Sequence, residues 1–117
     1  MYVNWKGYQT ADSIIDTGNK MIELIKTHKI VHILNDNREV KGTFTFEKSN
    51  RYCMATWVPA IQNCSIEKFA WIHGADVFTR FAAGKIMEMY PNRNVMTFFD
   101  FHEEAIAWLY PKKQAAA

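Results

Sequence analysis

The sequence predicts an α/β protein made of a single domain, in which four successive β-α units build a mostly parallel four-stranded sheet. The first observation is that strand patterns alternate with amphipathic helix patterns along the chain. The second is that 117 residues, 49% of them hydrophobic, are the size of one domain with one core. We expect that domain at residues 1–111, and residues 112–117 resemble in part a cloning remnant.

The first unit predicts a strand at residues 2–7 followed by a helix. Apolar and polar side chains alternate in this strand, and Gly7 ends the pattern. Thr10 is a suitable N-cap, and apolar residues then recur at helical spacing to about His28. Gly18 weakens this helix by roughly 1 kcal/mol relative to Ala, and it allows another segment to pack closely.

The second unit begins with a continuous apolar run at residues 29–34, which is typical of a strand buried on both faces. The polar residues 35–42 that follow predict a loop. In the next helix Ser49 is a candidate cap, and Pro59 predicts a kink or a break near residues 56–58.

The third and fourth units have the same pattern. Residues 69–73 predict a strand, and a helix from about Ala75 is ended by Pro91. Residues 94–99 predict the fourth strand, and a last helix follows it.

The last helix is predicted to start at Asp100 and Glu103, which resemble a capping box, and to be closed by Pro111. If each strand is added on the same side of the previous one, right-handed crossovers place every helix on one face of the sheet. Because the third and fourth strands are apolar on both faces, something must cover the second face. Helices after a reversal of strand order, a missing N-terminal element or a second copy in a homodimer would each do so.

Composition excludes several classes of function. Fourteen Lys and Arg against twelve Asp and Glu give a net charge of +2 with no basic stripe, so nucleic acid is not an expected partner. No apolar run is long enough to span a membrane, and we expect a cytoplasmic protein. Cys53 and Cys64 lack the spacing of a metal site or redox motif, so we expect reduced thiols, no metal and no cofactor.

The main candidate site is the polar segment after the second strand, because open α/β sheets place ligands and partners at strand ends. A planar guanidinium and two amides could bind an anion, a polar ligand or a partner. The structural alternative is preferred: Asn and Asp shape the turn, and the Arg pairs with a neighbouring carboxylate. The candidate residues of this segment are Asn35, Asp36, Asn37, Arg38 and Lys41.

Two further groups complete the candidate residues. His73 and Asp76 lie on the same predicted rim as Asp36 and could form an acid–base site, although a hydrogen-bonded His and a first-turn Asp are simpler roles. Phe44 and Phe46, with the Trp57 that follows, could line an apolar pocket or contact a partner, although packing under the loop is the plainer account.

Several segments together resemble the bacterial STAS/SEC14-like family, small α/β proteins related to the anti-sigma factor antagonists. They are Trp5-Lys6-Gly7-Tyr8, Leu34-Asn35-Asp36-Asn37-Arg38 with Val40-Lys41-Gly42, Trp57-Val58-Pro59, Phe69-Ala70-Trp71 and Glu104-Ala105-Ile106-Ala107-Trp108-Leu109. The likeness covers about residues 2–109, and it implies a regulatory or binding module rather than an enzyme.

The resemblance also implies a place to look for a phosphorylation switch. Sporulation-type antagonists carry a phosphorylatable Ser in an Asp-Ser-x-Gly turn at the start of the second core helix, whereas the corresponding segment here has no Ser. Thr43 and Thr45 could accept phosphate, but neither matches that motif.

Three hypotheses follow. The first is a non-catalytic STAS-like module that presents residues 35–41 to a protein partner. The second is a carrier or sensor that holds a small apolar or lipid-like ligand beside Phe44, Phe46 and Trp57. The third is a hydrolase-like enzyme that uses Asp36 with His73.

Overall fold

The four-stranded parallel sheet is present in the computed structural model, which describes residues 1–43, 46–75, 77–90 and 92–111. The strand order is β1-β2-β3-β4, and all three neighbouring pairs are parallel. The predicted fold class is therefore confirmed. In chain order the elements are β1 (Tyr2–Gln9), α1 (Ala11–His28), β2 (His32–Thr43), α2 (Phe46–Tyr52), the π-helix η1 (Cys53–Trp57), α3 (Val58–Gln62), β3 (Lys68–Ile72), α4 (Val77–Met89), β4 (Met96–Phe99) and α5 (His102–Leu109).

The start of α1 agrees with the sequence. Thr10 is the N-cap, its side chain accepts a hydrogen bond from the Ser13 backbone N–H, and the Ser13 side chain bonds back to Thr10. Gly18 is buried on this helix, where a Cβ atom would come within 2.7 Å of the Tyr52 hydroxyl and 3.1 Å of Trp57. The predicted close approach at Gly18 is therefore real.

Strand β1 is longer than predicted. It does not end at Gly7 but runs to Gln9, with register shifts against β2 on both sides of Gly7. Gly7 has φ of +74°, a conformation that costs Gly little. It therefore allows an irregularity within the strand rather than ending it.

The polar segment is a strand, not a loop, and this is the main correction to the sequence prediction. Strand β2 continues through the segment to Thr43 because β1 pairs with it there, from Tyr2 beside Leu34 to Gln9 beside Thr43. Pairing with a neighbouring strand has thus outweighed the low strand propensity of Asn and Asp.

The helix between β2 and β3 is interrupted, as Pro59 predicted. A π-helical segment, η1, separates α2 from α3, and Pro59 lies in the first turn of α3, where a missing N–H costs little. The predicted cap was wrong, because Ser49 lies buried within α2, which begins at Phe46.

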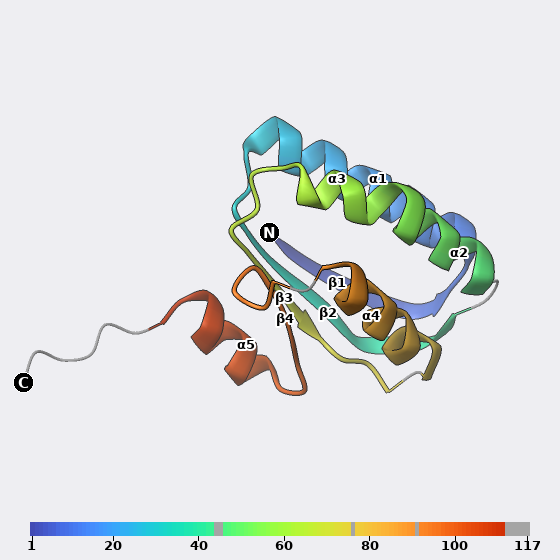
Figure 1. The fold of residues 1–117 in the computed structure, drawn as a ribbon. Coiled ribbons are helices and arrows are strands. Elements are labelled where there is room, and N and C mark those ends of the chain that lie inside the picture. Colours follow the sequence, from blue (N-terminus) through green and yellow to red (C-terminus); the bar gives the residue numbers. More distant parts are fainter. Residues whose placement is uncertain (44–45, 76, 91, 112–117) are drawn as a thin grey trace, which may run out of the picture.

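The helices form two layers around the sheet. Figure 1 shows α1, α2, α3 and α4 on one side and α5 on the other. The larger core lies under the first four helices and includes Ile33, Phe69 and Met96 from the sheet. A smaller core joins the opposite face to α5 through Leu34, Ile72 and other apolar side chains.

Helix α5 covers the second face of the sheet, and the strand order is not reversed. It follows the last strand and packs Ala105 and Leu109 over β3 and β4. Its predicted capping box is absent: the N-cap is Phe101, which makes no side-chain cap bond, and Asp100 lies 3.5 Å from Arg80 instead. None of the helices in the described ranges is long and apolar enough to cross a membrane.

Candidate functional site

A cavity of about 100 Å³ lies between the sheet and the layer formed by α1, α2, η1 and α4. Its wall is almost entirely apolar, and it is only partly enclosed. Among the described residues, none of the side chains that line it is charged. Tyr52 and Trp57 belong to the helix layer, whereas Trp5 and Trp71 belong to the sheet. A small apolar ligand would meet aromatic rings from both layers.

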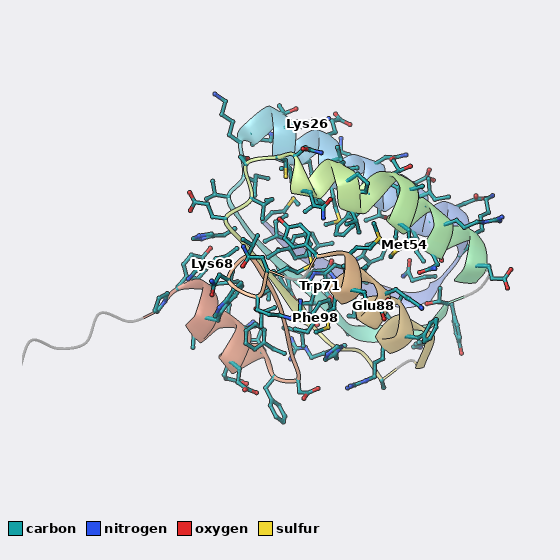
Figure 2. The ribbon with its side chains drawn as sticks, in the orientation of Figure 1. Lys26, Met54, Lys68, Trp71, Glu88 and Phe98 are labelled. Carbon is teal, nitrogen blue, oxygen red and sulfur yellow. The ribbon has the colours of Figure 1, made fainter. Side chains whose placement is uncertain are left out.

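The aromatic rings beside the cavity contact one another. Trp71 stacks on Phe69 and Phe98, with ring centroids 5.1 and 5.3 Å apart, and Trp57 meets the edge of Trp71 at 5.8 Å. Figure 2 shows Trp71 and Phe98 together beside α4. Offset and edge contacts of this kind add about 0.5–1.5 kcal/mol per pair beyond the area that they bury. These contacts therefore hold the aromatic rings of the sheet in place beneath the helix layer.

The helix that packs over these aromatic rings is irregular. The π-helical segment η1 supplies Cys53 and Trp57 to the cavity wall. Burial raises the pKa of the Cys53 thiol to about 11, so it is protonated at neutral pH. Single π-helical turns inside α-helices are rare and occur frequently at functional sites. The irregular turn here carries Trp57, whose ring contacts Phe69 and Trp71 of the sheet.

Two polar atoms in lining residues have no hydrogen-bond partner among the described residues. They are the indole Nε1 of Trp71, a residue that is only 9% exposed, and the side-chain oxygen of Asn50. An unsatisfied buried polar group costs about 1–3 kcal/mol. A ligand with a donor and an acceptor could satisfy both.

The amide side chains of the polar segment face this cavity. Asn35 is paired with Val3 and Trp71 across the sheet, so it shares their face. Its side-chain oxygen accepts a hydrogen bond from Trp5 Nε1 at 2.7 Å, and its amide donates to Asn37 at 3.2 Å. Both Asn residues are buried. The predicted Asn35 and Asn37 thus belong to the cavity wall, not to an exposed loop.

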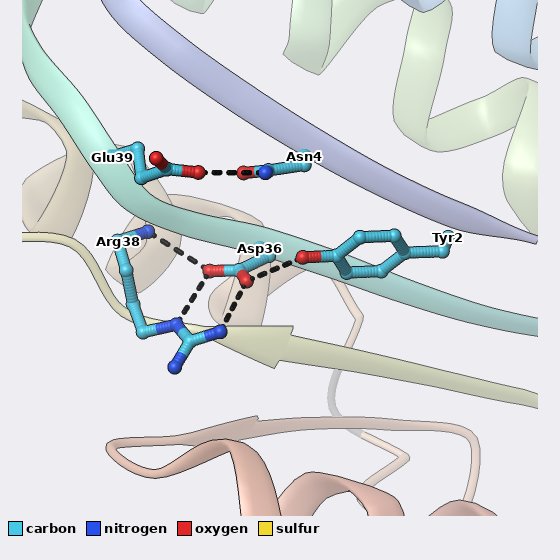
Figure 3. Close-up of polar contacts among 5 residues, drawn as sticks. All are labelled: Tyr2, Asn4, Asp36, Arg38 and Glu39. Atoms are coloured by element: carbon cyan, nitrogen blue, oxygen red, sulfur yellow. Dashed lines mark hydrogen bonds and ion pairs between the residues drawn. The ribbon is translucent and has the colours of Figure 1, made fainter.

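Asp36 lies on the opposite face and is 2% exposed. Its carboxylate accepts hydrogen bonds from Arg38 Nε and Nη2 at 3.0 and 2.7 Å, from the Arg38 backbone at 3.0 Å, and from the Tyr2 hydroxyl at 2.9 Å. Figure 3 shows this arrangement, with a separate bond from Asn4 to Glu39 beside it. Of the two neighbouring carboxylates that the sequence offers, Asp36 and Glu39, Asp36 is the partner of Arg38.

The electrostatics of this group follow from its contacts. Burial alone would raise the pKa of Asp36, but the hydrogen bonds from the side chain and backbone of Arg38 and from Tyr2 outweigh it and lower that pKa to about 2. The hydrogen bond to Asp36 in turn raises the pKa of Tyr2 and that of the Arg38 guanidinium. The carboxylate is therefore ionised and already satisfied, which is a structural arrangement rather than a catalytic one.

The proposed acid–base pair is not assembled. Asp36 is paired with Ile72 across the sheet, whereas His73 stacks on Phe98, which shares the face of Trp71. The two candidate residues therefore lie on opposite faces. Burial, with a smaller effect of Arg80, lowers the pKa of His73.

The remaining predicted site residues have separate positions. Arg38 and Lys41 are exposed on β2, and Trp57 lines the cavity. Phe44, Asp76, Thr45 and the side chain of Phe46 lie outside the described residues.

The sequence reasoning missed Trp5, Asn50 and Trp71 as wall residues. Trp5 and Trp71 were visible as large aromatic residues within predicted strands, whereas nothing singled out Asn50. No sequence signal showed that these residues would surround a space rather than fill it.

Comparison with known proteins identifies the fold. No protein-family model matches the sequence, and no curated protein matches it. The structure is similar to that of an uncharacterized protein from the DUF3478 family with a SpoIIAA-like fold from Shewanella loihica PV-4, with a TM-score of 0.51 and 14% identity. The likeness covers 90% of this chain and 79% of that chain. The chain has a SpoIIAA-like fold. This is the STAS-type fold that the resemblance implied, and the likeness shows the fold alone.

Proposed function

We propose that this protein is a non-catalytic sensor module of STAS-like fold that binds a small molecule in the cavity between its sheet and its helix layer. The cavity is the observation that carries the proposal. It is apolar, bounded by aromatic rings from both layers, and next to an irregular turn of helix. Largely apolar cavities with few polar groups are the usual form of a small-molecule site.

The arrangement of the wall supports a sensing role. Trp57 of η1 and Ala83 of α4 line the cavity from two different helices, whereas Trp5 and Trp71 line it from the sheet. A ligand that contacts all four would favour one position of these helices over another, and it would shift their population by its difference in affinity for the two positions. The outer surface of α2 and η1 would then report the bound state.

The test is a titration of the isotope-labelled chain with toluene and phenol, followed by two-dimensional NMR. We expect the amide signals of η1 and α4 to move first. Ala83 is buried and lines the cavity, so Ala83→Leu should fill it and abolish the effect. The matched control is Ala107→Leu, because Ala107 is exposed on α5 across the sheet. Equal binding by the two variants would show that these compounds bind elsewhere.

A second candidate function is the binding of a protein partner along β2. Arg38, Glu39 and Lys41 are exposed on this strand, and they are the part of the polar segment that a partner could reach. Because Arg38 is engaged by Asp36, the better test residue is Lys41. Lys41→Glu should abolish capture of a partner from the protein's own host at unchanged stability, and unchanged capture would exclude this surface.

A further inference from the structure

We infer that the ligand of the cavity is an uncharged compound the size of a single ring that carries a hydroxyl group, that is, a member of the phenol class. This inference rests on the proposed function and narrows it. Three properties of the cavity support it: the absence of charge in its described wall, its volume, and the polar atoms of two lining residues that have no hydrogen-bond partner among the described residues.

Charge is the first argument. None of the described side chains that line the cavity is an Asp, Glu, Lys, Arg or His. A carboxylate or an ammonium group would therefore lose its hydration without gaining a partner of opposite charge, which is strongly unfavourable. Asp36 and Arg38 cannot supply one, because they pair with each other on the opposite face of the sheet. The ligand is neutral.

Volume is the second argument. The cavity has about 100 Å³, or the space of about three water molecules at roughly 30 Å³ each. A cavity of about 150 Å³ is known to accommodate benzene, so this one accepts a single ring after a small adjustment of its wall. A ring also suits a wall that is lined by the aromatic residues Trp5, Tyr52, Trp57 and Trp71.

The unsatisfied atoms are the third argument. Trp71 Nε1 can only donate a hydrogen bond, and the Asn50 side-chain oxygen can only accept one. A hydroxyl group does both. Both atoms are buried, so a ligand in the cavity reaches them only when neighbouring side chains move aside. The amide of Asn50 can turn toward a ligand, because its terminal torsion has a broad energy well.

The experiment is a set of NMR titrations of the full chain with phenol, toluene, benzoate and decanoate. We expect phenol to bind in the cavity roughly threefold to tenfold more tightly than toluene, which is the effect of one net hydrogen bond. Benzoate and decanoate should leave the signals of η1 and α4 unchanged at the same concentrations. Binding of either anion at these signals would overturn the inference.

Variants identify the atoms responsible. Trp71→Phe keeps a ring and removes the N–H, so phenol and toluene should bind with equal affinity. Trp108→Phe is the matched control, because Trp108 lies on α5 across the sheet and should keep the preference for phenol. Asn50→Leu is a second test at a half-buried position, should Trp71→Phe fail to fold.

The outcomes separate this inference from the proposed function. If toluene binds as tightly as phenol in the wild-type chain, the cavity is a binding site but the hydroxyl is not recognised, and the inference is overturned alone. If neither toluene nor phenol binds, or if both bind the Ala83→Leu variant unchanged, the proposed function itself is wrong.

Discussion

Replacement of Asp36 by Asn should destabilise the protein by an amount that depends on pH. The wild-type carboxylate accepts four hydrogen bonds, three of them from Arg38 and one from Tyr2. These contacts lower its pKa from 3.8 to about 2, which corresponds to roughly 2 kcal/mol of stability at neutral pH. Loss of one partner of a fully buried ion pair costs about 3–5 kcal/mol, but the Arg38 side chain is 47% exposed and can turn toward water. We therefore expect Asp36→Asn to lower the free energy of unfolding by about 2 kcal/mol at pH 7.

The sign of the pH dependence follows from the direction of the shift. Because the folded pKa lies below the unfolded value, the stabilisation is complete above about pH 5 and is lost as the pH falls toward 2. About half of it should be gone at pH 3. The difference between wild type and variant should shrink in step, because Asn does not titrate.

Urea unfolding followed by tryptophan fluorescence at pH 7, 5, 4 and 3 measures this difference. Asp16→Asn is the matched control, since Asp16 is exposed on α1, and it should change stability by less than about 0.5 kcal/mol at every pH. A difference for Asp36→Asn that stays constant from pH 7 to pH 3 would refute the electrostatic reasoning, and a difference near zero at pH 7 would refute the hydrogen-bonded arrangement itself.

Three further predictions concern packing and reactivity. Gly18→Ala gains up to about 1 kcal/mol of helix propensity, but it forces a Cβ to within 2.7 Å of the Tyr52 hydroxyl, and overpacking of about 1–3 kcal/mol should lower the melting temperature. Gly84→Ala is the control and should raise the melting temperature, because its Cβ meets nothing within 4 Å. A higher melting temperature for Gly18→Ala than for Gly84→Ala would contradict the close contact at Gly18. Burial raises the pKa of the Cys53 thiol from 9.0 to about 11, so Cys53 in the folded protein should be alkylated at pH 8 about 100-fold more slowly than in the unfolded chain. Peptide mass spectrometry follows the alkylation, and equal rates in the two states would show an accessible thiolate. Leu109→Ala should cost about 2–4 kcal/mol in chemical unfolding if α5 covers the second face of the sheet, and a cost below about 0.5 kcal/mol would show that it does not.

The architecture could be predicted because local patterns agree with it. The Thr10 cap, the helical spacing to His28 and the irregularity before Pro59 all depend on neighbours in the chain. Gly18 was informative for the same reason, since a glycine inside a helix pattern requires a packing explanation. These features predict where each helix begins and ends, and the strands are then expected in the segments between the helices.

The candidate site was harder to predict because it depends on contacts between distant segments. Residues 35–42 have the composition of a loop, but five residues of β1 pair with them, and Trp5 and Tyr2 satisfy Asn35 and Asp36. The sequence predicted the first strand only to Gly7, so no sequence signal showed how far β2 extends. The cavity left no such signal, because a gap between layers is the result of many side-chain positions and of no single motif.

The most direct test of the central claim is a crystal structure of the chain grown with phenol. We expect electron density for one ring in the cavity that Trp57 and Trp71 line, with its hydroxyl near Trp71 Nε1 or the Asn50 side chain. A cavity collapsed around Ala83 and Trp57, or phenol bound only at the outer surface, would contradict it.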